Sequence, residues 1–168
     1  MKLYAKTVPR GLGSDALHDA AYALLLEALQ ADWDIPGAQV EKTPRGKPYL
    51  AGENMPFISL SHTDGFVCCA VSDVPVGVDC EHPRRVSAGV MRRVCTEAEL
   101  ADIHVAPDPA ERFLQYWTIK ESISKKLGVG LTESFRAYAV AFVDGKPLCA
   151  GHRLHLEMRD GYYLAAAE

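Results

Sequence analysis

The chain has 168 residues, of which 48% are hydrophobic and 24% are charged, and its formal net charge is −4. These values are those of an ordinary globular protein and exclude a fibrous or disordered chain. The negative net charge argues against a nucleic-acid partner, and no uncharged apolar stretch approaches the roughly 20 residues that span a bilayer. We therefore expect a cytoplasmic protein with no nucleic-acid or membrane partner, built as one domain or as two small halves that share a core.

The cysteines are odd in number, lack a Cys-x-x-Cys pair and lie mostly in apolar contexts. This pattern is typical of reduced thiols in a core rather than of disulfides or a zinc site. The residues concerned are Cys68, Cys69, Cys80, Cys95 and Cys149.

The first half of the chain predicts one helix followed by short strands. Ser14 or Asp15 can cap a helix that runs to about Gln30, with leucines and alanines at helical spacing. Glycines and prolines then separate short apolar segments, which is typical of strands, and the segment 66–71 is apolar enough for a strand covered on both faces. The expected strands are 38–42, 57–60, 66–71 and 76–81.

The second half predicts helices followed by hairpins. A basic helical turn near 90–94 precedes two capping patterns, at 96–99 and 108–111, and the second of these opens a helix over 109–127. Three strands are expected at 135–143, 153–158 and 162–166, with Asp144-Gly145 and Asp160-Gly161 as turns. Helices and strands in both parts predict an α+β fold of two halves packed side by side.

Two acids lie on the expected strand 76–81. Because strand side chains alternate, Val78 and Cys80 can face a core while Asp79 and Glu81 project together from the other face. Two carboxylates on one face form a hard oxygen site of the kind that Mg²⁺ uses beside phosphates. The alternative is a solvated strand face with two unrelated acids.

The helix 109–127 carries a second set of charged residues. Trp117, Glu121 and Lys125 are spaced by four and share one face, whereas an apolar stripe lies on roughly the opposite face. A carboxylate and an ammonium group are thus presented together. On its own, this pattern is also that of an exposed helical ion pair.

Two turns supply further polar groups. Ser61 and His62 end the expected strand 57–60, where a hydroxyl and an imidazole can hold phosphate oxygens. Lys42, Arg45 and Lys47 lie on the proline-containing turn 42–48 and can meet phosphates. Either turn can instead be an ordinary solvated loop.

Together and in this order, the four segments resemble the 4'-phosphopantetheinyl transferase superfamily, specifically its Sfp-type branch, over residues 42–131. The pattern Gly-Lys-Pro, Ser-His, Gly-x-Asp-x-Glu and Trp-x-x-Lys-Glu-x-x-x-Lys is present at 46–48, 61–62, 77–81 and 117–125. The resemblance implies that family's α+β fold, a pseudo-dimer of two similar halves. We expect a monomer whose halves, 1–78 and 79–168, form one catalytic unit with the site between them.

The resemblance also implies an activity and its residues. The enzyme would transfer the 4'-phosphopantetheine arm of coenzyme A to a serine of an apo acyl or peptidyl carrier protein, with Mg²⁺ or Mn²⁺. The implied metal ligands are Asp79, Glu81 and Glu121. The implied catalytic residues are Glu99, Glu121 and Lys125. The implied coenzyme A contacts are Lys42, Arg45, Lys47, Ser61, His62, Asp79, Lys120 and Lys125, with His62 at the 3'-phosphate.

The base that takes the proton of the serine is left open. Glu99 matches the glutamate of the family's Thr/Ser-x-x-Glu element, and its alternative role is only to close the capping pattern at 96–99. The sequence departs from the branch in its first helix, because residues 14–32 contain no Lys or Arg, although Sfp-type enzymes commonly carry a basic residue there for coenzyme A.

In this reaction the serine hydroxyl attacks the β-phosphorus of the pyrophosphate and expels 3',5'-ADP, so negative charge must be neutralised on the phosphate oxygens. Two other functions also account for the acids: a divalent-metal phosphodiesterase, or a non-catalytic relative that binds coenzyme A or a carrier protein. A fatty-acid, polyketide or nonribosomal peptide carrier is compatible with these motifs.

A basic cluster follows the acidic strand. Arg84, Arg85, Arg92 and Arg93 lie within ten residues that contain no acid. Because such carriers are typically acidic around their serine, we expect these arginines to help dock the carrier. The alternative is that they solvate a loop or pair with Glu97 and Glu99.

Overall fold

The computed structural model describes residues 1–130 and 135–168, so residue 131, where the family-like segment ends, lies outside the described part. The first half contains β1 (Lys2–Thr7), α1 (Ser14–Asp32), β2 (Val40–Lys42), β3 (Pro48–Leu50), β4 (Phe57–Thr63) and β5 (Phe66–Ser72). The second half contains β6 (Gly77–Glu81), α2 (Ala88–Val94), α3 (Glu97–Val105), α4 (Pro109–Leu127), a 3-10 helix (Phe135–Ala137), β7 (Ala141–Val143), β8 (Lys146–Leu148), β9 (Leu154–Arg159) and β10 (Tyr162–Ala167). The predicted α+β class is confirmed.

The longer strands form two antiparallel sheets of three strands, with the orders β1-β5-β4 and β6-β10-β9. In each sheet, the first and last strands along the chain are neighbours. In each half a helix of 19 residues is followed by a two-stranded hairpin and then by the final hairpin of the sheet. This shared order supports the expectation of two similar halves. We propose that the second half begins with β6, because a division between residues 78 and 79 would cut that strand.

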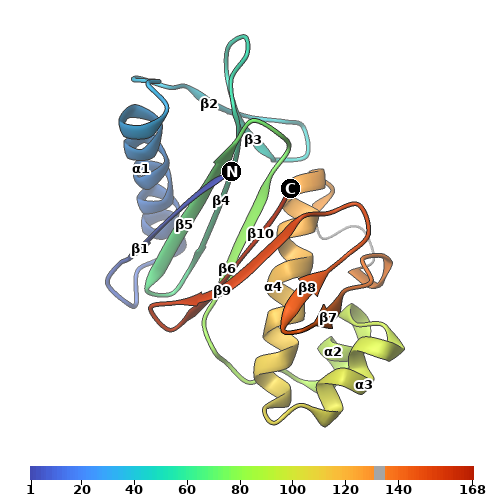
Figure 1. Cartoon of the computed structure of the whole chain (residues 1–168). Helices are drawn as coiled ribbons and strands as arrows, with labels where there is room; N and C mark the ends of the chain where they lie inside the picture. The colour runs from blue at the N-terminus through green and yellow to red at the C-terminus, as the bar shows by residue number, and fades with distance from the viewer. Residues whose placement is uncertain (131–134) are drawn as a thin grey trace.

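The sheets and helices are arranged in layers, with α1 and α4 on opposite sides of the strands (Figure 1). The two sheets share an apolar core that is formed by alternate residues of their strands. Its members from β5, β6 and β10 are Phe66, Cys68, Ala70, Val78, Cys80, Tyr162, Leu164 and Ala166. On the outer faces, Leu25 and Leu29 of α1 pack with Val71, and Ile119 and Ile123 of α4 pack in one cluster with Tyr163. Since both faces of β5 are covered, all its residues are buried, as predicted.

The junction between the halves runs along β4, β6 and α4. The backbone N–H of Val78 donates a hydrogen bond of 3.0 Å to Ser59 Oγ, so a side chain of β4 links the two sheets. Helix α4 crosses β6 so closely at Gly77 that a Cβ atom there would lie 1.9 Å from the carbonyl oxygen of Ser122. Glycine is therefore required at this position for the helix to approach the strand.

The local signals of the sequence are mostly confirmed. Thr96 and Glu99 form the predicted capping box, Asp108 caps α4 through its side chain, and the hairpin turns at 144–145 and 160–161 adopt positive φ. Neither Ser14 nor Asp15 caps α1, because the helix begins at Ser14 and its N-cap is Gly13, which has no side chain to accept a hydrogen bond.

Several short elements differ from the prediction. Residues 135–143 form a 3-10 helix and then the three-residue strand β7, rather than one long strand. The strands β1, β3 and β8 were not predicted. All five cysteines are free, and four of them are buried, as expected. In residues 1–130 and 135–168, no helix has the length and hydropathy needed to traverse a bilayer.

Candidate active site

Strand β6 presents its two acids to α4. Val78 and Cys80 point into the core between the sheets, whereas Asp79 and Glu81 form hydrogen bonds with side chains of α4. The two acids therefore project from one face of the strand, as the alternation of side chains predicts. Their exposures differ, because Asp79 is 6% exposed and Glu81 is half-buried.

A cation, an acid and a hydroxyl group meet beside β6. The Nζ atom of Lys125 donates hydrogen bonds of 2.7 Å to Asp79 Oδ1 and to Ser61 Oγ, and Ser61 Oγ donates one of 2.8 Å to the same carboxylate oxygen. Burial lowers the pKa of Lys125 and the Asp79 carboxylate raises it, with a net increase. Lys125 is therefore a persistent positive charge.

Asp79 keeps one oxygen available. Its Oδ2 atom is buried and has no hydrogen-bond partner among the described residues. A buried carboxylate oxygen without a donor is costly unless a cation or a donor from a ligand reaches it. This oxygen is the first sign that the site accepts a further group.

Glu121 lies one helical turn before Lys125. Burial and repulsion by Asp79 raise the pKa of Glu121 to about 7; the charge of Lys125 opposes this increase, and repulsion by Glu81 adds a smaller one. Three carboxylates and one lysine thus line the same cavity, and the excess negative charge favours a cation.

Glu81 is held by two different donors. The indole N–H of Trp117 donates to Glu81 Oε1 at 2.8 Å, and the Arg84 guanidinium lies 3.3 Å from the same oxygen. The Trp117 side chain reaches this carboxylate from α4, whereas Arg84 reaches it from the segment that follows β6.

These groups line a cavity of about 300 Å³ at the junction of the halves. Its walls are Leu60, Ser61, His62, Thr63, Asp79, Cys80, Glu81, Trp117, Glu121 and Lys125. The predicted metal ligands Asp79, Glu81 and Glu121 thus lie on one cavity with Ser61, His62 and Lys125. The segments involved come from β4, β6 and α4.

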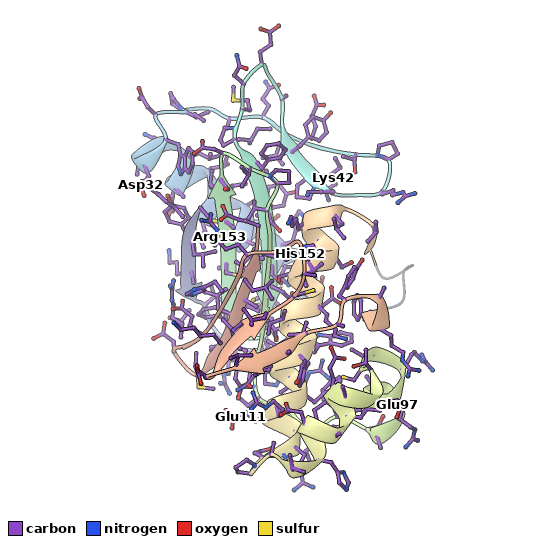
Figure 2. The ribbon with its side chains drawn as sticks, turned by 45° about the vertical axis from the view of Figure 1, so that its right-hand side comes forward. Asp32, Lys42, Glu97, Glu111, His152 and Arg153 are labelled. Atoms are coloured by element: carbon purple, nitrogen blue, oxygen red, sulfur yellow. The ribbon has the colours of Figure 1, made fainter. Side chains whose placement is uncertain are left out.

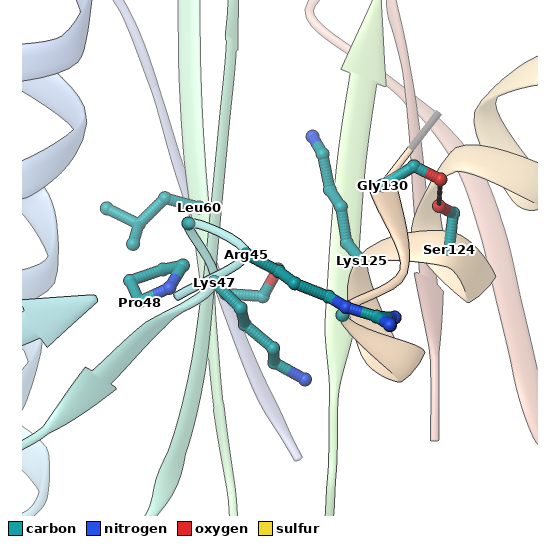
Figure 3. Close-up of a pocket in the computed structure, with 10 residues that line it drawn as sticks. Arg45, Lys47, Pro48, Leu60, Ser124, Lys125 and Gly130 are labelled. Atoms are coloured by element: carbon teal, nitrogen blue, oxygen red, sulfur yellow. Dashed lines mark hydrogen bonds between the residues drawn. The ribbon is translucent and has the colours of Figure 1, made fainter. Parts of the chain in front are cut away.

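Two further cavities adjoin the first and share Leu60 with it. One of about 250 Å³ is lined by Arg45 and Lys47 of the β2–β3 turn and by Lys125, as Figure 3 shows. The other, of about 170 Å³, is lined by Lys42 and His62. The structure therefore brings all three basic residues of the predicted turn to the same side of the molecule as Ser61 and His62.

The basic groups of these cavities are not equally free. Lys47 Nζ donates a hydrogen bond to the carbonyl oxygen of Lys126 at the end of α4, and burial followed by repulsion from Lys126 lowers its pKa. Burial, the charge of Lys125 and His18 lower the pKa of His62. Lys47 thus links the turn to α4 as well as lining the cavity.

Sequence reasoning missed two residues of the smallest cavity. His18 and Tyr22 of α1 line it, and their rings stack with centroids 4.4 Å apart. Two features of the sequence could have indicated them. The two residues are four apart and so share one face of the helix, and His18 is the one side chain of residues 14–32 that can carry positive charge.

Two predicted residues are not brought to the cavity. Lys120 and Glu99 form an ion pair of 2.6 Å, and their side chains are 0% and 1% exposed. Glu99 also accepts hydrogen bonds from the backbone of Thr96 and Val140, and Lys120 donates to two carbonyl groups. Helix α3, which begins at Glu97, lies towards the opposite end of the molecule from Lys42 (Figure 2). The structure thus places Glu99 and Lys120 away from the cavity, with their polar atoms bonded to each other and to nearby backbone.

The arginine cluster lies on and before α2. All four arginines are exposed, and Arg84 pairs with Glu81. The alternative partners are engaged elsewhere, since Glu97 pairs with Arg136 and Glu99 with Lys120. Arg85, Arg92 and Arg93 form no ion pair with the described residues.

The donor chemistry of the first cavity fits a divalent cation, although the carboxylates do not form a ready cage. Within residues 1–130 and 135–168, no three His, Cys, Asp or Glu side chains converge closely enough to hold a metal by themselves. Mg²⁺ keeps several waters and takes one or two carboxylates besides phosphate oxygens, so it does not require such a cage. The unpartnered Asp79 Oδ2 and the raised pKa of Glu121 are the features that a cation would relieve.

Comparison with solved structures identifies the fold. Holo-[acyl-carrier-protein] synthase from Thermotoga maritima matches 56% of this chain and 61% of its own, with 24% identity and a TM-score of 0.50. The synthase from Neisseria meningitidis matches with 19% identity and a TM-score of 0.50, and 94% of its chain corresponds to 55% of this one. These similarities show the fold alone.

Sequence comparison identifies the family. A 4'-phosphopantetheinyl transferase of Bacillus subtilis is 29% identical over 119 residues, which are 70% of this chain and 50% of that protein. The mouse L-aminoadipate-semialdehyde dehydrogenase-phosphopantetheinyl transferase is 32% identical over 124 residues, 64% of this chain and 40% of that protein. The chain thus spans about half the length of the curated relatives that it matches. The family model of the 4'-phosphopantetheinyl transferase superfamily matches residues 75–166, which contain β6 and α4. The chain belongs to the 4'-phosphopantetheinyl transferase superfamily, in its Sfp-type branch.

Proposed function

We propose that the chain transfers the 4'-phosphopantetheine arm of coenzyme A to a serine of an apo carrier protein, with a divalent cation, and releases 3',5'-ADP. The observation that carries this proposal is the contact of Lys125 on α4 with Asp79 on β6 and Ser61 on β4, at 2.7 Å each. This contact joins three of the four sequence motifs at one cavity. A fixed cation beside acids that attract a metal is what phosphoryl transfer requires.

Coenzyme A would lie along β4 across the three neighbouring cavities. We place its pyrophosphate beside Asp79 and Lys125 and its 3'-phosphate beside His62 and Lys42, where imidazole and ammonium groups line the smallest cavity. Arg45 and Lys47 would add positive charge from the β2–β3 turn. This placement uses the concave junction of two halves, where ligand sites are common.

Mg²⁺ or Mn²⁺ would be held by Asp79, Glu81 and Glu121, with water and phosphate oxygens as further ligands. The bound ion supplies charge neutralisation at the phosphate oxygens. Lys125 holds the Asp79 carboxylate in place. It also lines the cavity, where its ammonium group would contact a phosphate oxygen and stabilise the charge that develops on the transferred group.

The carboxylate that accepts the proton of the serine must face the cavity. Glu99 does not, since it is buried with Lys120, and we propose that this pair holds α3 and residue 140 in place instead. Glu121 faces the cavity, so we propose that its carboxylate accepts this proton. The oxygen of the serine then bonds to the β-phosphorus, and the bond from that phosphorus to the ADP oxygen breaks.

The carrier protein is proposed to dock at Arg84, Arg85, Arg92 and Arg93. Their exposure, together with the absence of internal ion pairs for the last three among the described residues, leaves positive charge available, and Arg84 itself contacts Glu81 of the cavity. An acidic carrier would be steered towards this charge despite the overall net charge of −4. The monomeric state and the cytoplasmic location remain predictions.

Incubation of the protein with coenzyme A, Mg²⁺ and a panel of apo carriers, followed by mass spectrometry of each carrier, tests the function. We expect one carrier to gain the mass of a phosphopantetheine group. Free phosphopantetheine or phosphate without a carrier adduct would instead indicate a phosphodiesterase. Binding of coenzyme A without any product would indicate a non-catalytic relative.

A further inference from the structure

The indole of Trp117 makes one polar contact that the proposed reaction does not use. Its Nε1–H donates to Glu81 Oε1 at 2.8 Å, and both residues line the cavity with Asp79 and Lys125. Building on the proposed function, we propose that Trp117 is a positioning residue, which aims the Glu81 carboxylate at the divalent cation.

The structure gives Trp117 the rigidity that such a role needs. It lies within α4, and its ring contacts Phe113 and Phe135, with centroids 6.2 Å and 5.5 Å away. It also packs against the apolar core of the second half. An indole that contacts two aromatic rings and the core is restrained, so its N–H sets the direction in which Glu81 points.

The second donor to Glu81 has a different effect. Arg84 is 42% exposed and approaches the carboxylate at 3.3 Å, so it is a partly solvated cation. Its positive charge offsets the carboxylate and repels an incoming metal ion. The indole is neutral, so it orients the carboxylate without removing the charge that attracts the cation. The two contacts thus act in opposite directions on metal affinity.

The chain offers a matched control, because it contains only two tryptophans. Trp33 also donates its indole N–H to an oxygen, Tyr4 Oη at 3.2 Å, and it is likewise partly buried. Trp33→Phe therefore removes the same group and the same type of hydrogen bond from a place outside the cavity.

The binding of Mn²⁺ by isothermal titration calorimetry, with the full chain and without carrier protein, tests the proposal. Trp117→Phe keeps an aromatic ring between Phe113 and Phe135 but lacks the N–H, so we expect its affinity for Mn²⁺ to fall about 10-fold. Arg84→Gln should bind Mn²⁺ several-fold more tightly, and Trp33→Phe should match the wild type. Equal affinities of Trp117→Phe and Trp33→Phe, or weaker binding by Arg84→Gln, would overturn the proposal.

A second measurement does not depend on the folding of Trp117→Phe. In Trp33→Phe the only indole is that of Trp117, so we expect saturable addition of Mg²⁺ to change its fluorescence as Glu81 engages the ion. The further substitution Glu81→Gln should remove this response. If the fluorescence of the double variant still changes with Mg²⁺ as that of Trp33→Phe does, the proposal is refuted. It is also refuted if Trp33→Phe binds Mn²⁺ with wild-type affinity but shows no change in fluorescence. Failure of the wild type to bind Mn²⁺ in the absence of coenzyme A would overturn the inference but not the proposed function, because phosphate oxygens of coenzyme A are further ligands of the ion there and the mass of the carrier tests that function separately. Failure of Trp117→Phe alone to differ likewise leaves the function standing.

Discussion

The substitution Glu121→Gln should raise the stability of the fold and abolish the proposed transfer activity. The pKa of Glu121 is raised from its ordinary value of 4.5 to about 7 by burial and by the charges of Asp79 and Glu81. Between these two values the unfolded chain loses a proton that the folded chain retains, so the free energy of unfolding falls as pH rises through this window. Above pH 7 the folded protein bears the whole free-energy cost of ionising Glu121 in its buried site. At 1.36 kcal/mol per pKa unit it is about 3 kcal/mol, which partial exposure reduces to about 1–3 kcal/mol.

Glutamine keeps the shape of the side chain but cannot ionise. In EDTA, Glu121→Gln should therefore unfold at higher urea concentration than the wild type at pH 8, by about 1–3 kcal/mol, and the difference should vanish near pH 4.5. Glu27→Gln is the matched control, because Glu27 is an exposed carboxylate on the other long helix. Mg²⁺ should stabilise the wild type at pH 8 and stabilise Glu121→Gln less, and the variant should not transfer phosphopantetheine.

The reasoning fails under two results. A Glu121→Gln protein that is less stable than the wild type at pH 8 would show that the carboxylate is not repelled by its neighbours. A difference in stability that does not change between pH 4.5 and pH 8 would show that the titration of Glu121 does not underlie it.

Three further experiments, each with one or two substitutions, test other parts of the structure. Gly77→Ala should destabilise the fold by roughly 3 kcal/mol or more in urea unfolding, because its Cβ would lie 1.9 Å from the backbone of α4, and a variant as stable as the wild type would contradict this packing. Lys120→Met should cost about 3–5 kcal/mol because it leaves the buried Glu99 unpaired, and the double variant with Glu99→Gln should recover part of that loss; if it recovers none, the pair is not coupled. Charge reversal at Arg92 and Arg93 should raise the KM for the carrier and weaken its salt dependence while the Kd for coenzyme A stays constant, and an unchanged KM would place docking elsewhere.

Helix α4 illustrates how much the sequence predicts. Its predicted limits, Pro109–Leu127, are those observed, since proline at the first helical position and the N-cap Asp108 are local signals. The spacing of four among Trp117, Glu121 and Lys125 also predicts one common face, and all three line the same cavity. Helical periodicity depends only on neighbouring residues, so it can be predicted without knowledge of the fold.

The ion-pair partners of two lysines of α4 could not be predicted from the sequence. Lys120 and Lys125 both match the family pattern, and both were expected at coenzyme A. In the structure Lys125 meets Asp79 at the cavity, whereas Lys120 is buried with Glu99. A separation of five residues rotates them well apart around the helix, but only the packing of α3 decides which acid each lysine meets.

The sequence also did not predict the shortest strands. The strand β3 has three residues, and so has β8, and each is held by one neighbouring strand rather than by its own pattern. The segment 135–143 has the residues of a strand, but Phe135 packs against Trp117 and the chain turns there into a 3-10 helix. Long-range packing overrides β propensity in such segments.

By itself, the sequence determined the limits of α4, the buried central strand β5, the acids that share one face of β6, and the motif order that resembles the transferase family. These features follow from periodicity and from local hydrogen bonding, which act within a few residues. The tertiary structure alone decided that Ser61 meets Asp79, 18 residues away, and Lys125, 64 residues away. Such contacts depend on the packing of two sheets across a shared core and on the close approach of α4 that Gly77 permits, and no local pattern encodes either distance.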